Sequence, residues 1–230
     1  MRDRLKDAAY WVRAEQYRKD RIASFQEAMV NRKNTERYNK NMRLRILNNK
    51  FELFWAAFSK GAPLEQCREM YLDCLRSSAD LWEWKTNYND LLWYTSLGVL
   101  FRVDQQDAAI LEQIALTTGS ADQLICSLLR AVKPDHCVPA VDEVPPPYHI
   151  AASVFSMERQ QAEAVLTDYL KKQWYRGQRH EAWYNDHKWD DNLYLGYWSF
   201  ETAALVRILG LNDEKLKKSP YYPPELADYQ

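Results

Sequence analysis

The sequence predicts an all-α protein, a helical bundle of about eight to ten helices in two closely packed halves with little or no sheet. Apolar residues recur at three- and four-residue spacing along most of the chain, as they do on one face of a helix. No run alternates with period two for long enough to indicate a strand, and six glycines in 230 residues disfavour a fold rich in tight hairpins. The run LGVLFRV at 97–103 is better explained as a buried helix end.

The first half of the chain predicts helices over 3–30, 35–59 and from Pro63 to Trp82. The stripe over 35–59 is the clearest, and its members are Leu44, Leu47, Phe51, Phe54, Trp55 and Phe58. Gly61 ends this helix, and Pro63 suits the start of the next one. Shorter helices are expected over 89–102, 105–117 and 121–132, with Ser120 as the N-cap of the last.

A proline-rich connection divides the chain, because residues 133–147 hold five of the nine prolines. We therefore expect an N-terminal charged subdomain over 1–132 and a C-terminal helical subdomain over 148–230. In the second half, helices are predicted over 151–176, 194–209 and 212–217, with an extended proline-containing tail after them.

The helix expected over 194–209 places Tyr197, Trp198 and Glu201 on one apolar face. Burying an ionised carboxylate without partners costs roughly several kcal/mol. We therefore expect a Tyr, a Trp or a cation to hydrogen-bond Glu201. A structural role for this carboxylate is favoured over a role in a site.

The charge is uneven along the chain. Residues 1–50 hold fourteen basic and six acidic side chains, a net charge of +8, which leaves −9 for the remainder. The acidic remainder favours a basic protein partner over nucleic acid, although a purely solubilising acidic face is an alternative. The basic residues near Tyr10 and Trp11 would suit nucleic acid, but acidic residues are mixed among them, and a solvated helical hairpin is favoured.

The four cysteines form no C-x-x-C pair and are expected to be ordinary reduced thiols; they are Cys67, Cys74, Cys126 and Cys137. The first twenty residues are too charged for a signal peptide, and no stretch has the roughly 20 apolar residues that span a bilayer. A cytoplasmic protein without membrane contact is the expectation.

The sequence offers no support for catalysis. Metal-ligand types crowd together at His180, Glu181, Asp186, His187, Asp190 and Asp191. However, H-E-x-x-H is incomplete, and His180 and His187 would lie roughly 10 Å apart on a helix, too far for a shared zinc ion. No nucleophile elbow or glycine-rich phosphate loop occurs. We expect no enzyme activity, no catalytic residue, no metal and no cofactor.

Three aromatic motifs stand in order near the C-terminus. They are Trp183-Tyr184-x-x-His187, the run Tyr194-Leu195-Gly196-Tyr197-Trp198-Ser199-Phe200-Glu201, and Ser219-Pro220-Tyr221-Tyr222-Pro223. This series resembles the motifs of the PoNi family of nuclease-immunity proteins. The match is most specific over about 148–226, and residues 1–130 are similar to the less distinctive N-terminal part of the family. Pro223-Pro224-Glu225-Leu226 departs from the usual Pro-Tyr-Asp-Leu, which affects only the expected packing of the tail.

The resemblance implies an α-helical immunity protein that binds and inhibits a polymorphic toxin, a DNase often delivered by type VI secretion or a contact-dependent system. The motif residues are expected to be structural, and they are Trp183, His187, Gly196, Tyr197, Trp198, Glu201, Tyr221 and Tyr222. Toxin contacts are instead expected on acidic and aromatic surface positions, namely Asp142, Glu143, Glu181, Tyr184, Asp186, Asp190 and Asp191. These would meet the toxin's basic DNA-binding cleft.

Two alternatives stay open at this point. One is a helical adaptor for another protein partner, and the other is a metal-dependent hydrolase that uses the carboxylates and histidines of 180–201. The sequence names neither the toxin nor the oligomeric state.

Overall fold

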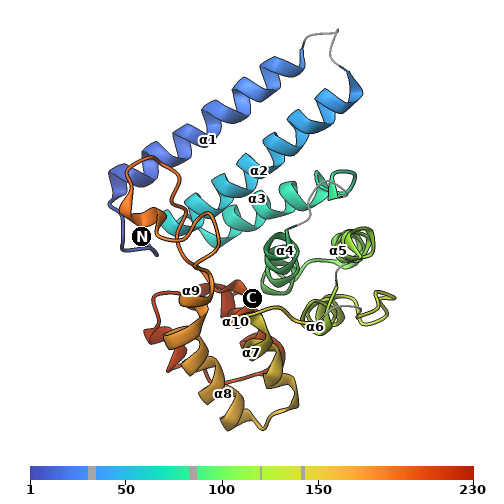
Figure 1. Cartoon of the computed structure of the whole chain (residues 1–230), viewed down its shortest axis with the longest axis vertical. Coiled ribbons are helices and arrows are strands. Elements are labelled where there is room, and N and C mark those ends of the chain that lie inside the picture. The colour runs from blue at the N-terminus through green and yellow to red at the C-terminus, as the bar shows by residue number, and fades with distance from the viewer. Residues whose placement is uncertain (31–34, 83–86, 120, 141–142) are drawn as a thin grey trace. The chain divides into compact units, whose positions relative to one another are not determined.

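The computed structural model describes residues 1–30, 35–82, 87–119, 121–140 and 143–230 (Figure 1). Within these ranges the chain forms helices and connecting segments and contains no β-strand, so the all-α prediction is confirmed. None of the described helices combines the length and the apolar character that crossing a membrane requires.

Residue contacts divide the chain into two compact units that do not follow its order. Unit 1 comprises Met1–Trp84 together with Asn185–Gly196, and unit 2 comprises Lys85–Tyr184 together with Tyr197–Gln230. The segment 185–196 therefore belongs with the N-terminal helices although it lies far along the sequence. The contacts group the residues differently from the subdomains expected on either side of 133–147. That the chain has two subdomains separated at 133–147 stays a prediction.

Unit 1 is built on a helical hairpin. Helices α1 (Ala8–Met29) and α2 (Glu36–Lys60) run antiparallel, and α3 (Leu64–Arg76) lies beside α2 (Figure 1). Their facing sides bury large aromatic rings, among them Trp11, Phe54, Phe58 and Tyr71. Helix α2 ends as predicted at Gly61, whose φ of 103° lies in the left-handed region where a Cβ is disfavoured.

The expected bounds of two helices in unit 1 were wrong. α1 begins at Ala8, not residue 3, because Asp7 Oδ1 caps it by accepting from the Tyr10 N–H at 2.7 Å. The backbone before Asp7 instead pairs with the end of α2, where the N–H groups of Arg2 and Asp3 both donate to the Ser59 carbonyl at 3.0 Å. α3 ends at Arg76, before the expected Trp82.

Unit 2 contains α4 (Tyr88–Leu100), α5 (Gln105–Thr118) and α6 (Gln123–Val132), close to their predicted ranges. α4 is apolar on nearly every side and packs against α5, α6 and α10 (Phe200–Leu209). The expected N-cap Ser120 lies outside the described residues. Asp122 caps α6, because its Oδ1 accepts from the Ile125 N–H at 2.9 Å.

The single helix predicted over 151–176 is wrong, since this stretch is a series of short pieces. They are α7 (Tyr148–Ala152), the 3₁₀ turn η2 (Ser153–Ser156), α8 (Arg159–Asp168), the π turn η3 (Tyr169–Gln173) and α9 (Trp174–Gly177). Met157 is extended, with ψ of 153°, which interrupts the helical hydrogen bonds between η2 and α8.

The helix predicted over 194–209 begins only at Phe200, so Tyr197 and Trp198 do not share a helix face with Glu201. Gly196, with φ of 99°, turns the chain, and the Ser199 N–H donates to the Tyr221 carbonyl at 2.8 Å. Residues 194–199 accordingly lie outside any helix. The aromatic side chains are nevertheless buried, at 4% exposure each for Tyr197 and Trp198.

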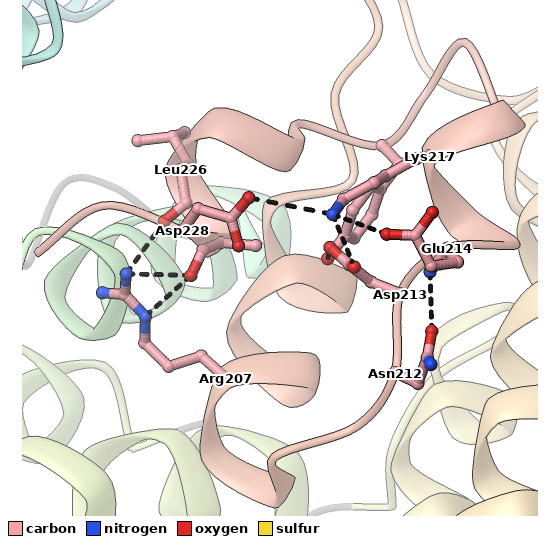
Figure 2. A network of polar contacts seen from close by, with 9 residues as sticks. Arg207, Asn212, Asp213, Glu214, Lys217, Leu226 and Asp228 are labelled. Carbon is pink, nitrogen blue, oxygen red and sulfur yellow. Dashed lines mark hydrogen bonds and ion pairs between the residues drawn. The ribbon is translucent and has the colours of Figure 1, made fainter.

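One arginine and one lysine hold the C-terminal tail of unit 2 in place through polar contacts (Figure 2). Arg207 donates to the carbonyls of Leu226 and Ala227 in the tail and to those of Val99 and Leu100 in α4. Residues 224–227 form the short helix α11 (Pro224–Ala227) and not the extended tail that the prolines predicted.

Lys217 lies within the 3₁₀ turn η5 (Leu216–Lys218), where a short helix was expected over 212–217. Its Nζ forms ion pairs with Asp213 at 3.0 Å and Glu214 at 3.2 Å, and with Asp228 at 3.9 Å (Figure 2). These carboxylates raise the pKa of Lys217. The ammonium group thus joins the tail to the loop after α10.

Candidate protein-binding site

The segment 185–196, called the return segment below, lies in unit 1 against the start of α1 (orange in Figure 1). It opens with Asn185 in the left-handed region and the 3₁₀ turn η4 (Asp186–Lys188). After η4 the backbone forms no helix; Trp189 is extended, and Asn192 is a second left-handed residue. A chain outside a helix leaves its carbonyl groups without helical partners, so side chains of the hairpin must supply the hydrogen bonds.

Three α1-side residues supply those donors. Lys6 Nζ donates to the Trp189 carbonyl at 2.6 Å, and Tyr10 Oη donates to the Tyr194 carbonyl at 2.9 Å. Arg18 donates to the carbonyls of Asn192 and Leu193. The return segment is therefore fixed at its backbone along the length of the first half of α1.

The far end of the return segment is anchored by buried groups. Tyr194 is 1% exposed, and its hydroxyl donates to Asp3 Oδ2 at 2.6 Å. The Leu195 carbonyl accepts from Ser59 Oγ at 2.5 Å, and the Gly196 carbonyl accepts from Trp55 Nε1 at 3.2 Å. Burial raises the pKa of Asp3, while the Tyr194 hydrogen bond opposes that shift.

The outward side of the return segment is both apolar and acidic. Trp189 is 64% exposed and Leu193 is 44% exposed. The Asp190 side chain is 73% exposed and pairs with Arg13 of α1 at 2.9 Å. Such an exposed pair contributes little to stability, about 0–1 kcal/mol. The Asp190 carboxylate can therefore leave Arg13 and pair with a cation of a binding partner at little cost.

Two further carboxylates lie close together in the return segment. Asp191 Oδ1 accepts from the Leu193 N–H at 3.0 Å, which shapes the turn. Burial and the neighbouring Asp191 charge raise the pKa of Asp186. The His187 ring packs edge-on to Tyr194 at 6.1 Å between centroids, and burial lowers its pKa, as do Lys188 and Lys6.

The structure divides the acidic and aromatic residues expected to contact a toxin between the two units. Asp186, Asp190 and Asp191 lie in unit 1, while Glu143, Glu181 and Tyr184 belong to unit 2. Asp142 lies outside the described residues. Glu143 lines a separate surface hollow of about 560 Å³ with His149 and Phe155, so it does not join Glu181 and Tyr184 in a common pocket.

The charge of each unit refines the pattern seen along the sequence. Unit 1 holds eighteen basic and fifteen acidic side chains, a net charge of +3, and unit 2 holds thirteen and seventeen, a net charge of −4. The return segment places three carboxylates on the otherwise basic unit 1, against one cation of its own, Lys188. It is thus an acidic surface element within a basic unit.

Tyr184 belongs to an aromatic cluster in unit 2. The Tyr175 ring contacts those of Tyr184, Tyr197 and Tyr221 at centroid distances of 4.6, 4.9 and 5.4 Å. Trp183 packs on Tyr197 at 5.7 Å. Because Tyr184 uses its ring within this cluster, much of its surface is already committed to the fold.

Glu201 lies at the centre of a buried polar group in unit 2. It is 0% exposed, and its Oε1 accepts from Ser199 Oγ at 2.6 Å and from Tyr169 Oη at 3.2 Å. The predicted hydrogen bond from a tyrosine is confirmed. Trp174 Nε1 lies near enough to favour the ionised carboxylate, yet neither it nor Glu201 Oε2 completes a hydrogen bond within the described ranges. Burial raises the pKa of Glu201 to about 7.

The remaining motif residue of the tail, Tyr222, is 2% exposed and donates to Asp213 Oδ2 at 3.0 Å. In the ranges that the structure covers, no three His, Cys, Asp or Glu side chains gather as a metal site would require. The crowded ligand types of 180–191 therefore do not converge there.

Sequence reasoning missed the residues that build the return segment into unit 1, namely Lys6, Arg13 and Arg18, and it missed Trp189. No local pattern links residues more than 170 positions apart. Trp189 did carry a signal, because it stands directly before two aspartates within a polar stretch and has no helical apolar neighbours.

Comparison with known families covers almost the whole chain. Residues 2–113 match the family described as PoNe immunity protein (PoNi), N-terminal, and residues 120–226 match PoNe immunity proteins (PoNi), C-terminal. The chain belongs to the PoNi family. Its three C-terminal motifs are thus those of a nuclease-immunity family, and the resemblance noted from the sequence is confirmed.

A solved structure supports the fold of this PoNi protein. The crystal structure of protein PA2201 from Pseudomonas aeruginosa aligns with a TM-score of 0.72 at 19% identity, covering 99% of this chain and 89% of that one. None of the curated proteins matches the chain.

Proposed function

We propose that this PoNi protein binds a cognate nuclease toxin and neutralises it by covering the toxin's DNA-binding surface. The observation that carries the proposal is the match of both halves of the chain to the immunity family. The toxin would be an antibacterial DNase delivered by type VI secretion or a contact-dependent system. The immunity protein would act in the cytoplasm of the producing cell, where the DNA to be protected lies.

Electrostatics supports a block at the DNA-binding surface. A DNase must present cations to the phosphate backbone, so an inhibitor gains by offering carboxylates to the same cations. This chain offers them at Asp186, Asp190 and Asp191 in unit 1 and at Glu143 and Glu181 in unit 2. Complementary charge would speed encounter with the toxin before it reaches DNA.

Co-expression with the nuclease encoded beside this chain tests the proposal. Cells that express the nuclease alone should lose viability, and cells that also express the PoNi protein should survive. A PoNi chain from a different toxin locus is the control, because immunity discriminates among related toxins. Failure of the cognate pair to restore survival would contradict immunity and leave the adaptor role.

The hydrolase alternative is separated by a different readout. A hydrolase would retain zinc or manganese through purification and would lose turnover in the His187→Ala variant. The immunity account predicts protection without bound metal. Protection that required a metal-dependent turnover would contradict it.

A further inference from the structure

We propose that Trp189 is the anchor by which the return segment docks into the cationic DNA-binding cleft of the toxin, with Leu193 beside it and Asp190 and Asp191 as its charged rim. This inference rests on the proposed function and names the surface that performs it. Its partner is a basic cleft of a nuclease, and its anchor is an aromatic side chain that the fold does not use.

The exposure of Trp189 is the first support. Nearly two thirds of this large ring faces solvent, whereas seven other tryptophans of the described chain are buried or half-buried. Leaving so much apolar surface in water forgoes stabilisation that burial would provide, about 25 cal/mol per Å². Trp is also the residue type most enriched among interface hot spots.

The rigidity of the backbone beneath Trp189 is the second support. Its own carbonyl accepts from Lys6 Nζ at 2.6 Å, and the carbonyls of Asn192 and Leu193 accept from buried Arg18. Arg18 is 1% exposed, so its guanidinium is shielded from water. A surface loop held in this way loses little conformational entropy on binding, which favours tight association.

The charge around Trp189 identifies the partner. The ion pair with Glu52 offsets the charge of Arg18, and Asp190 and Asp191 follow Trp189 directly in the sequence. Asp191 carries no ion pair in the described ranges, and Asp190 holds only the exposed pair with Arg13. A ring flanked by carboxylates fits a surface built for stacked bases and phosphates, where aromatic groups and cations alternate.

Affinity measurements on single variants test the anchor. The probe is the nuclease domain encoded beside this chain, inactivated at its catalytic residue, titrated calorimetrically with the full-length PoNi protein. Trp189→Ala should weaken binding by at least about 30-fold, as expected for a hot-spot tryptophan. Tyr38→Ala is the matched control, because Tyr38 is an aromatic side chain of the same unit that is 41% exposed.

A second pair of variants tests the extent of the surface. Leu193→Ala should weaken binding about tenfold, since Leu193 is the other exposed large apolar side chain of the return segment. Leu116→Ala in unit 2 is its control, because Leu116 is similarly exposed, at 40%. Trp189→Ala and Leu193→Ala should both unfold close to the urea concentration at which the parent unfolds, because neither side chain is buried in the core.

The outcomes separate this inference from the proposed function. If the parent protein neither protects cells nor binds the nuclease, the proposed function is overturned and the anchor with it. If the parent protects and binds while Trp189→Ala binds as tightly, the anchor alone is overturned. A Trp189→Ala change that alters the mass of the free protein in solution, with toxin affinity unchanged, would assign the surface to self-association and also overturn it.

Discussion

Arg18 Nε donates a hydrogen bond to Glu52 Oε2 at 3.1 Å, and this ion pair joins the two helices of the hairpin. The Arg18 side chain is 1% exposed. The same guanidinium reaches the carbonyls of the return segment through its other nitrogens. One planar fork thus connects α1, α2 and the return segment. A lysine could not make all of these bonds.

Arg18→Lys should therefore lower the free energy of unfolding by about 2 kcal/mol, because it keeps the charge but removes donors from Glu52 and from the carbonyls of the return segment. Urea unfolding followed by tryptophan fluorescence measures the loss. Arg21→Lys on the same helix is the control and should cost less than about 0.5 kcal/mol, since Arg21 is more exposed and its hydrogen bond to Tyr17 is long, at 3.4 Å. Equal losses in the two variants would contradict this role for Arg18.

Tyr194→Phe should remove the 2.6 Å hydrogen bond from the Tyr194 hydroxyl to Asp3 Oδ2. The buried Asp3 carboxyl would then lose its main side-chain hydrogen-bond donor. We expect a loss of about 1–2 kcal/mol in unfolding free energy. Tyr197→Phe provides the comparison, because the hydrogen bond from the Tyr197 hydroxyl to the Trp183 carbonyl is much longer, at 3.5 Å. A larger loss for Tyr197→Phe would show that the Asp3 contact is not what anchors the return segment.

Glu201 predicts a pH dependence of stability. Burial raises its pKa in the folded protein to about 7, above the ordinary glutamate value of 4.5, so the folded state holds a proton that the unfolded state releases. The contribution of this bound proton to the free energy of unfolding is on the order of 3 kcal/mol. It is fully present below pH 4.5 and is lost as the pH rises through 7.

Glu201→Gln should remove this part of the pH dependence, because its side chain does not titrate. Chemical unfolding of both proteins at intervals from pH 4.5 to 8 supplies the comparison. The difference between the parent and the variant should move in favour of the variant as pH rises. A constant difference across this range would mean that Glu201 does not hold a proton in the folded protein.

Reversing the charges of Asp190 and Asp191 to lysine should slow association with the toxin about tenfold at low salt and change dissociation less, as rim charges do. Stopped-flow kinetics at two salt concentrations measures both rates. Asp80→Lys is the matched control, because Asp80 also pairs with an arginine, Arg43, on the surface of unit 1. Association rates that match the parent's in low salt would remove these two aspartates from the docking surface.

The helices of this protein were predictable where apolar spacing and local caps agree, as at α2, which is capped by Thr35 and Gly61. Prediction failed where a distant partner decides the backbone. Tyr197 and Trp198 fit a helical stripe, but the Ser199 N–H pairs with Tyr221, twenty-two residues later, and the helix begins only at Phe200. Periodicity contains no information about such a pair.

The candidate site was predictable in part for the same reason. The sequence drew attention to Asp190 and Asp191 through their charge and to Trp183 through its motif. It could not indicate that residues 185–196 return to the first hairpin, since that depends on Lys6 and Arg18 meeting carbonyl groups. The fold separates the two tryptophans further, since Trp189 is 64% exposed whereas Trp183 packs on Tyr197.

The central claim, that this PoNi protein neutralises a nuclease by direct binding, is tested most directly by a titration of DNA cleavage. Purified toxin nuclease encoded beside this chain is held at a fixed concentration well above the dissociation constant, and the immunity protein is added stepwise to a plasmid-cleavage reaction. Cleavage should fall linearly and reach zero at one equivalent of PoNi protein. Cleavage that continues undiminished at roughly a tenfold excess of the immunity protein would contradict the claim.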